Sequence, residues 1–251
     1  MARSLGLSRV RLSGRRGIGG GGPAPAEWAP SDLTNLRGWY RADDLVTTGS
    51  AVTTWTDKSG VGNNLTDGGV AGRRPTLASG FNGGSQPYVS FNGSSNWLSG
   101  ATFSWGATAS PCTYAVIGTY QTYVASENWI SYNFTNVLRY RSSIGGMQFG
   151  AGNPQNLTGG DSSDTPSPAS FLVMGVWTGS ANFLYYGTTQ KNTGANTNAA
   201  PADGAALAVG ATSGGAAFAE FQAAEIIIMR AAITADERTS LAAYAASRYG
   251  V

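Results

Sequence analysis

The segment Glu220-Phe-Gln-Ala-Ala-Glu-Ile-Ile-Ile-Met229 is followed, after four residues, by Thr234-Ala-Asp-Glu237. Ile226 to Met229 form an unbroken apolar run of mainly β-branched residues, which is typical of a strand covered on both faces. Thr234 and Glu237 stand at capping-box spacing, and the acidic residues 236 and 237 favour the first turn of a helix. A buried strand that leads directly into a helix is therefore predicted.

The predicted helix carries its larger side chains on one face and has a defined end. Leu241, Tyr244, Ala245 and Arg248 recur at helical spacing, and Gly250 supplies a stop signal. We expect this face to pack on the rest of the fold.

Short segments rich in β-branched and aromatic residues precede this ending. They predict strands over residues 36–40, 51–55, 88–91, 114–118, 129–134, 137–141, 171–176, 182–186 and 206–211, besides 220–229. Turn signals such as Asn92-Gly93, Gly145-Gly146 and Asp203-Gly204 separate them. Many short strands at this spacing indicate an all-β sandwich.

Composition limits the classes of protein and of site. The chain has 251 residues, of which 41% are hydrophobic and 12% charged, and this suits one large β domain over residues 31–251. Cys112 is the single cysteine, so an intrachain disulfide is excluded. The absence of histidine excludes Ser–His and Cys–His nucleophile pairs and histidine-ligated metals. No apolar run of 18 residues occurs, so we expect no membrane partner.

Residues 1–30 read as a basic arm followed by a Gly- and Pro-rich linker. All arginines of the arm precede the first acidic residue, Glu27, and they are Arg3, Arg9, Arg11, Arg15 and Arg16. The remaining chain has 16 − 5 = 11 basic against 14 acidic residues. We expect the arm to anchor the protein to an acidic partner, either a protein or a nucleic acid. An organellar transit peptide is an alternative interpretation of this composition.

Several motifs carry a family resemblance. They are Trp39-Tyr40-Arg41-Ala42-Asp43-Asp44-Leu45, Trp55 to Leu65, Arg74-Pro75-Thr76-Leu77, Val89-Ser90-Phe91-Asn92-Gly93, Trp97-Leu98 and the strand-to-helix ending. In this order the chain resembles LamG-like domains, the concanavalin A-like lectin/glucanase jelly rolls, in the form carried by tailed-bacteriophage proteins. The resemblance implies a jelly-roll sandwich of two antiparallel sheets with a short C-terminal helix and an extended N-terminal arm.

The same resemblance singles out Glu220, Gln222 and Glu225, because laminarinase-like enzymes of this fold carry Glu-x-Asp-x-x-Glu on a strand. The middle residue here is glutamine, which cannot relay a proton. On a regular strand, Glu220 and Glu225 would also face opposite ways, whereas retaining hydrolysis needs two carboxyls close together. We therefore expect no catalytic residue and no enzymatic activity.

Calcium is the cofactor alternative that the resemblance raises. Asp43, Asp44 and Asp57, with the Asn63-Asn64 pair, could supply oxygen ligands. The competing interpretation is that these residues form turns, and no denser acidic cluster adds the ligands that calcium needs. We favour turns and expect no bound cofactor.

Aromatic residues are concentrated in the middle third of the chain. We interpret Trp39, Trp55 and Trp177 as core residues. Trp105 and Tyr123 lie in predicted loops and are candidates for exposed rings that contact a glycan.

Together these features predict a non-enzymatic bacteriophage virion structural protein, either a head decoration or a tail-associated protein. It would be present in multiple copies, assembled in the host cytoplasm, and attached to capsid or tail proteins through the arm. One alternative is a carbohydrate-binding module that attaches the particle to host glycans. The other is a glycoside hydrolase.

Overall fold

The computed structural model describes residues 27–106, 111–121, 127–133, 136–141, 146–151, 158–159, 170–197 and 203–251. Residues 1–26 of the predicted arm lie outside these ranges, and with them Arg3, Arg9, Arg11, Arg15 and Arg16. Tyr123 also lies outside the described residues.

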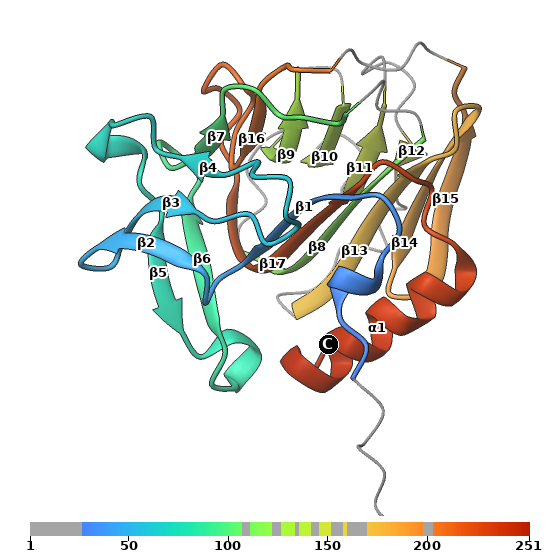
Figure 1. Ribbon diagram of the computed structural model, residues 1–251, viewed down its shortest axis with the longest axis horizontal. Helices are drawn as coiled ribbons and strands as arrows, with labels where there is room; N and C mark the ends of the chain where they lie inside the picture. The colour runs from blue at the N-terminus through green and yellow to red at the C-terminus, as the bar shows by residue number, and fades with distance from the viewer. Residues whose placement is uncertain are drawn as a thin grey trace, which may run out of the picture.

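The described strands form a sandwich of two antiparallel layers, as predicted (Figure 1). The back sheet consists of β5 (Thr76–Ser79), β6 (Pro87–Asn92), β1 (Leu36–Arg41), β17 (Glu220–Met229), β8 (Cys112–Tyr120), β13 (Ser170–Trp177), β14 (Ala181–Tyr186) and β15 (Thr189–Ala195). The front sheet consists of β4 (Leu65–Thr66), β7 (Leu98–Gly100), β16 (Leu207–Val209), β9 (Glu127–Tyr132), β10 (Asn136–Arg141), β11 (Gly146–Gly150) and β12 (Thr158–Gly159).

A hairpin joins the layers at one side. It consists of β2 (Leu45–Thr48) and β3 (Ala51–Trp55), and β3 pairs with β4 of the front sheet and with β5 of the back sheet. The described residues also form three short 3-10 helices: η1 (Pro30–Asp32), η2 (Ala71–Arg73) and η3 (Phe81–Gly83).

The main core fills the space between the two layers. Phe221 of β17 is stacked between Phe91 and Trp129, with ring centroids 4.7 Å apart in both pairs. Packing is close enough to specify a glycine, because a Cβ at Gly175 would lie 2.1 Å from Cδ2 of Phe149. Interiors packed this tightly do not tolerate an added methyl group without a shift of the neighbours.

A β-bulge divides β17 into two halves. Its pairing with β8 shifts register between Ala223 and Glu225, and its other edge passes from β6 to β1 at the same point. Phe221 and Ala223 face the main core, whereas Ala224 packs in the second cluster on the outer face of the back sheet.

This bulge corrects one expectation from the sequence. Glu220 and Gln222 alternate with the core-facing residues and therefore lie on the outer face, which Glu225 also occupies through its contacts with Trp39 and Tyr249 of the second cluster. Glu220 and Glu225 thus share a face of the strand, and the extra residue of the bulge is the reason.

The predicted helix is confirmed as α1 (Ala235–Tyr249). Thr234 caps it by accepting a hydrogen bond from the backbone N–H of Glu237, the Glu237 carboxylate closes the capping box, and Gly250 ends it with a φ of 71°. The helix lies on the outer face of the back sheet, where Leu241 and Ala245 are fully buried in the second cluster (Figure 1).

Sequence analysis predicts no strand at β2, β4, β5, β7, β11, β12 or β15. Of these β11 is fully buried, and the others are short or polar. The predicted bounds of Ala51–Trp55 and Glu220–Met229 match the structure, and the other predicted strands agree to within a few residues. No strand was expected at β15, whose residues Thr189–Ala195 are polar and mostly exposed, or at β4, which has two residues. Gly146 was read as part of a turn but begins β11.

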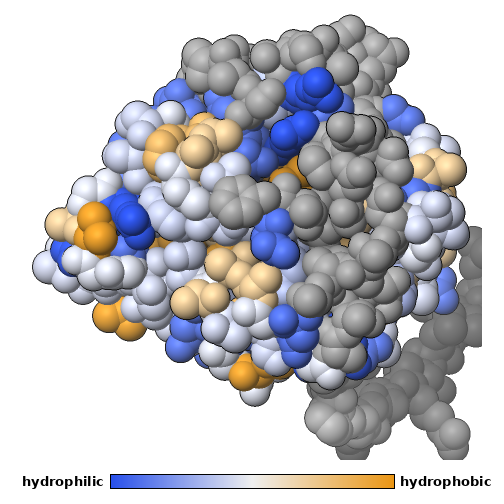
Figure 2. Space-filling model, turned by 90° about the horizontal axis from the view of Figure 1, so that it is seen from above, coloured by the Kyte–Doolittle hydropathy of each residue, from blue (hydrophilic) through white to orange (hydrophobic). Residues whose placement is uncertain are grey.

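The described surface exposes little apolar material. On the face shown in Figure 2, apolar atoms of the described residues form small separate patches among polar ones. The exposed large hydrophobic side chains in the described part of the chain are Val46 and Val70. Among the described residues, no helix combines the length and apolar character needed to cross a membrane.

Candidate functional site

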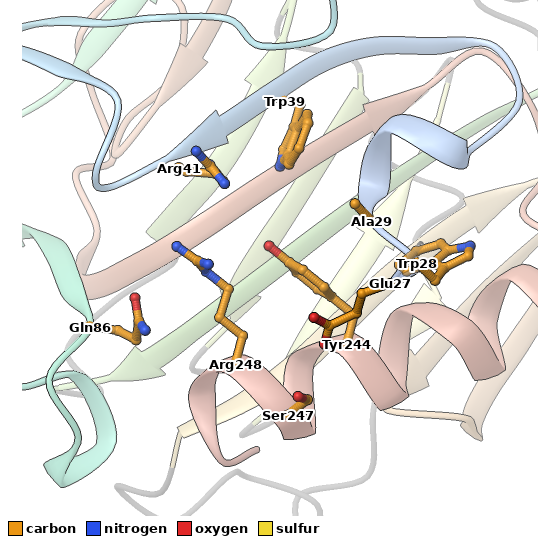
Figure 3. Close-up of a pocket in the computed structure, with 9 residues that line it drawn as sticks. All are labelled: Glu27, Trp28, Ala29, Trp39, Arg41, Gln86, Tyr244, Ser247 and Arg248. Atoms are coloured by element: carbon orange, nitrogen blue, oxygen red, sulfur yellow. The ribbon is translucent and has the colours of Figure 1, made fainter. Parts of the chain in front are cut away.

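A cavity of about 390 Å³ opens beside the C-terminal half of α1 (Figure 3). Three aromatic side chains line it: Trp28 before η1, Trp39 of β1 and Tyr244 of α1. The basic side chains of Arg41 and Arg248 border it from the strand and from the helix. The volume lies within the range of pockets that hold small ligands, and aromatic walls with a few polar groups are typical of such pockets.

Glu225 binds two of these aromatic side chains, Trp39 and Tyr244. Its side chain is fully buried at the bulge of β17. One carboxylate oxygen accepts a hydrogen bond from the indole N–H of Trp39, and the other accepts from the hydroxyls of Tyr244, at 2.9 Å, and Tyr249, at 2.6 Å. Because both oxygens are engaged inside the protein, Glu225 positions the pocket's rings and does not itself face a ligand.

Burial shifts the titration of this cluster. Burial raises the pKa of Glu225, although the hydrogen bonds from Tyr249, Trp39 and Tyr244 oppose the shift. Burial and the nearby carboxylate raise the pKa of both tyrosines as well, so their hydroxyls remain donors. The three donors therefore converge on one carboxylate, and this fixes the orientation of their rings.

The two arginines are held by aspartates at the rim. Arg41 pairs with Asp44 at 2.7 Å and with Asp43 at 3.3 Å. Arg248 pairs with Asp43 at 2.8 Å, so one carboxylate links the strand to the helix. The guanidinium of Arg41 also lies over the Trp39 ring, 5.2 Å from its centroid. The Nη1 groups of Arg41 and Arg248 make no hydrogen bond within the described part of the chain and remain available as donors.

Further polar groups at the cavity are uncommitted. The side chains of Gln86, Ser247 and Glu27 line it, and none makes a hydrogen bond or ion pair with another described residue. An amide, a hydroxyl and a carboxylate together offer donors and acceptors to a ligand that carries hydroxyl groups.

Two smaller cavities adjoin the first along α1. One of about 340 Å³ shares Gln86 and Arg248 with it and continues to the loop at η3. The other, of about 310 Å³, shares Trp28, Tyr244 and Ser247 and continues toward Ser240. Because the three cavities share lining residues along α1, they are together named here the helix groove.

The calcium candidates are occupied by protein partners. Asp43 and Asp44 bind the arginines at the groove, and Asp44 also lies 3.4 Å from Lys58. Asp57 forms a turn and accepts five hydrogen bonds, including those from the backbone N–H groups of Trp39, Ser59, Gly62 and Asn63. The structure thus has the turns that the sequence favoured. In the described ranges, no three His, Cys, Asp or Glu side chains are grouped to hold a metal ion.

The expectation that Trp105 is exposed is wrong. Its side chain is fully buried and stacks on Tyr114 at 6.1 Å between the layers. The loop around Trp105 turns inward because its backbone N–H bonds the Asp203 carboxylate and its carbonyl accepts from Arg230. The ring therefore packs in the core and offers no surface face to a glycan.

The other aromatic residues of the middle third are also buried where the structure describes them: Trp97, Tyr120, Trp129, Tyr132 and Tyr140. The predicted core positions of Trp39, Trp55 and Trp177 are confirmed, although Trp39 lies in the outer cluster and reaches the groove.

Sequence analysis missed the helix groove because its parts are distant in the chain. Arg248 and Asp43 are separated by 205 residues, and Trp39 and Glu225 by 186. The one available signal was the face of the helix that carries Tyr244 and Arg248, two polar-tipped side chains among apolar ones.

The triplet Glu220, Gln222 and Glu225 does not form a paired-carboxylate site. Five residue steps along the strand place the two glutamates about 16 Å apart. Retaining hydrolysis requires a separation of about 5 Å. Glu225 is committed to the aromatic cluster, as described above.

Comparisons with known proteins identify the fold. No protein-family model and no curated protein match the chain. The sialidase of Trypanosoma rangeli matches with a TM-score of 0.57 at 12% identity, over 84% of this chain and 33% of the sialidase. The chain therefore spans about a third of the length of that enzyme.

Two smaller neighbours match over more of their own length. Domain 4 of AbnA, a GH43 extracellular arabinanase from Geobacillus stearothermophilus, solved in complex with arabinotriose, has a TM-score of 0.55 at 15% identity, over 83% of this chain and 98% of that domain. The binding domain of Paraclostridial Mosquitocidal Protein 1 has a TM-score of 0.58 at 11% identity, over 86% of this chain and 53% of that one. At these identities the likeness shows the fold alone, a concanavalin A-like sandwich.

These neighbours contradict the expectation that the protein has no enzymatic activity, because a third of a sialidase and one domain of an arabinanase share its fold. The expectation rested on the altered triplet at Glu220, Gln222 and Glu225 and on the absence of histidine. Glycoside hydrolysis uses pairs of carboxyl groups, and the chain has 14 acidic residues. A shared fold transfers no particular activity to this chain either.

Proposed function

We propose that the helix groove binds carbohydrate. The observation that carries the proposal is the central cavity, in which the rings of Trp28, Trp39 and Tyr244 stand beside the uncommitted side chains of Gln86 and Ser247. A sugar ring has an apolar side and a rim of hydroxyl groups. Aromatic walls suit the first, and amide, hydroxyl and guanidinium groups suit the second.

Two of the structural neighbours support a binding function. One of them is a domain solved with arabinotriose, and another is described as a binding domain. Both share the fold of this chain, and they motivate a search among neutral oligosaccharides.

The test is a glycan array probed with the full-length protein, followed by calorimetric titration with arabinotriose and with each array hit. Gln86→Ala should weaken binding about threefold to tenfold, because it removes hydrogen bonds to the ligand. Ser247→Trp should block the central cavity. Ala246→Trp is the matched control, because Ala246 is exposed on the same helix and lines none of the three cavities.

An array without any hit would refute carbohydrate binding. Hits whose affinity is unchanged in both Gln86→Ala and Ser247→Trp would place the binding site elsewhere. Measuring released sugars in the same titrations shows whether bound glycans are also cleaved.

We further propose that this binding domain is of the LamG-like type found in tailed-bacteriophage proteins and is displayed on a particle through residues 1–26. The charge of the arm supports this proposal, since its five arginines precede any acidic residue. Multiple copies on a particle would give avidity for host glycans. Deleting residues 2–26 should leave thermal melting unchanged and abolish incorporation into particles, and normal incorporation would refute the anchoring role.

A further inference from the structure

We infer that the ligand of the helix groove is a neutral, linear oligosaccharide of at least three sugar units, one in each cavity. This inference rests on the proposed carbohydrate binding and adds the length and the charge of the ligand.

The length follows from the arrangement of the cavities. The central cavity shares Gln86 and Arg248 with one neighbour, and Tyr244 and Ser247 with the other. The lining residues on α1 run from Ser240 to Gly250, beyond the helix end. Ten residue steps at the helical rise correspond to about 15 Å. A single monosaccharide is too short to occupy this groove.

The cavity at η3 has a rigid, polar wall. The amide of Asn82 donates to the carbonyls of Tyr249 and Gly250, at 3.0 and 2.9 Å, and so ties the loop to the end of the helix. Ser85 is exposed and lines the cavity, and its hydroxyl makes no hydrogen bond within the described ranges. This cavity can therefore bind a sugar through its hydroxyl groups.

The opposite cavity has an aromatic wall. Trp28 and Tyr244 contact each other edge to face, with centroids 6.0 Å apart, and Ser240 and Ser247 line the helix side. One sugar face can rest on the exposed part of this pair while the serines bind its rim. Rings and hydroxyl-binding groups thus recur at intervals along the groove, as a chain of similar units requires.

The neutral character of the ligand follows from the ion pairs around the groove. Arg41, Arg248 and Lys58 face the carboxylates of Asp43 and Asp44, and the exposed Glu27 carboxylate borders two of the cavities. Both arginines that line the groove are therefore paired with an aspartate, and Glu27 adds a further carboxylate at its edge. An acidic sugar would have to compete with an aspartate for each arginine and would meet the Glu27 carboxylate, which has no partner among the described residues. A neutral sugar needs only the arginine N–H groups that make no hydrogen bond within those residues.

The experiment measures affinity against chain length with the full-length protein. The probes are arabinose to arabinopentaose and glucose to cellopentaose, together with an array of neutral and acidic oligosaccharides. Affinity should rise about tenfold per unit up to three units and then level off. Ala243→Trp at one end cavity and Ser85→Trp at the other should each reduce trisaccharide affinity to the disaccharide level, because these residues line those cavities. Ala246→Trp should leave trisaccharide affinity unchanged.

The outcomes separate the two proposals. A monosaccharide that binds as tightly as its trisaccharide, or a preference for acidic over neutral chains, would overturn this inference and leave carbohydrate binding intact. End-cavity variants that bind trisaccharide like the wild type would overturn it as well. Absence of binding to every probe would overturn the proposed function itself.

Discussion

Replacing Glu225 tests the buried cluster under the groove. In Glu225→Leu, the Trp39 N–H and the Tyr249 hydroxyl lose their acceptor while both side chains remain buried. Each orphaned donor costs about 1–3 kcal/mol. Tyr244 is only partly buried and can turn its hydroxyl to water. The substitution also removes the cost of burying a carboxylate, and this offsets part of the loss. We therefore expect Glu225→Leu to lower the free energy of unfolding by about 3 kcal/mol.

Glu225→Gln keeps one acceptor oxygen and the shape of the side chain. It should lower the free energy of unfolding by about 1–2 kcal/mol, less than Glu225→Leu, because one oxygen still accepts hydrogen bonds. The remaining loss arises because the amide nitrogen cannot accept from the donor that it faces. Both variants should also weaken ligand binding, since Trp39 and Tyr244 lose the group that orients them.

The pH dependence gives a second, sharper readout. Burial raises the pKa of Glu225 above its ordinary value of 4.5, so between 4.5 and the raised pKa the folded chain holds a proton that the unfolded chain has lost. The stability contribution of this group is therefore complete below 4.5 and is lost as the pH rises through the folded pKa. Glu225→Gln lacks this titration. The difference in unfolding free energy between wild type and Glu225→Gln should shrink as the pH rises.

The assay is urea unfolding followed by tryptophan fluorescence, at several pH values from 4.5 upward. Taking the difference between the two proteins cancels the titration of all other groups. A difference that stays constant or grows with pH would refute the account of Glu225, and so would a Glu225→Leu protein as stable as the wild type.

Three further substitutions test the helix cap and the packing that position the groove. Each is measured by thermal and urea unfolding. Thr234→Ala removes the cap that accepts from Glu237 and should cost about 1 kcal/mol. Ile227→Asp places a carboxylate in the packed layer between sheet and helix, where Ile227 is 1% exposed, and should prevent folding. Gly175→Ala forces a Cβ against Phe149 and should cost about 1–3 kcal/mol.

Matched controls accompany these changes. Thr239→Ala, on the exposed side of α1, should have little effect. Ile227→Val should fold with a loss of about 1 kcal/mol. Gly72→Ala should be close to neutral, because nothing lies within 4 Å of its Cβ position. Equal losses in Thr234→Ala and Thr239→Ala would contradict the capping role, and a folded Ile227→Asp or an unaffected Gly175→Ala would contradict the packing described here.

Local signals explain why parts of the fold could be predicted from the sequence. Thr234 and Glu237 make their capping contacts within one helical turn. The uninterrupted apolar run from Ile226 to Met229 predicts a buried strand without reference to its neighbours. The bulge at Ala224 could not be predicted in the same way, because its position depends on where β6 ends and β1 begins. The facing of Glu220 and Glu225 was therefore misjudged.

The groove depended on contacts that no local pattern encodes. Trp39 was correctly assigned to the buried residues, but its indole N–H is held by Glu225, far along the chain. Trp105 is predicted to be exposed because it lies in a predicted loop. Its burial depends on hydrogen bonds to Asp203 and from Arg230, which lie about a hundred or more residues away.

The position of β17 in the back sheet has a consequence for how the chain folds during synthesis. This last strand pairs with β1, β6 and β8, which are all made much earlier. Until it leaves the ribosome, the edges of these three strands that it covers have no partner, and unpaired edges invite association between chains. Closure over such long sequence separations is also slow. A nascent chain stalled before residue 220 should therefore aggregate, whereas one from which β17 and α1 have emerged can close the sheet in a single late step.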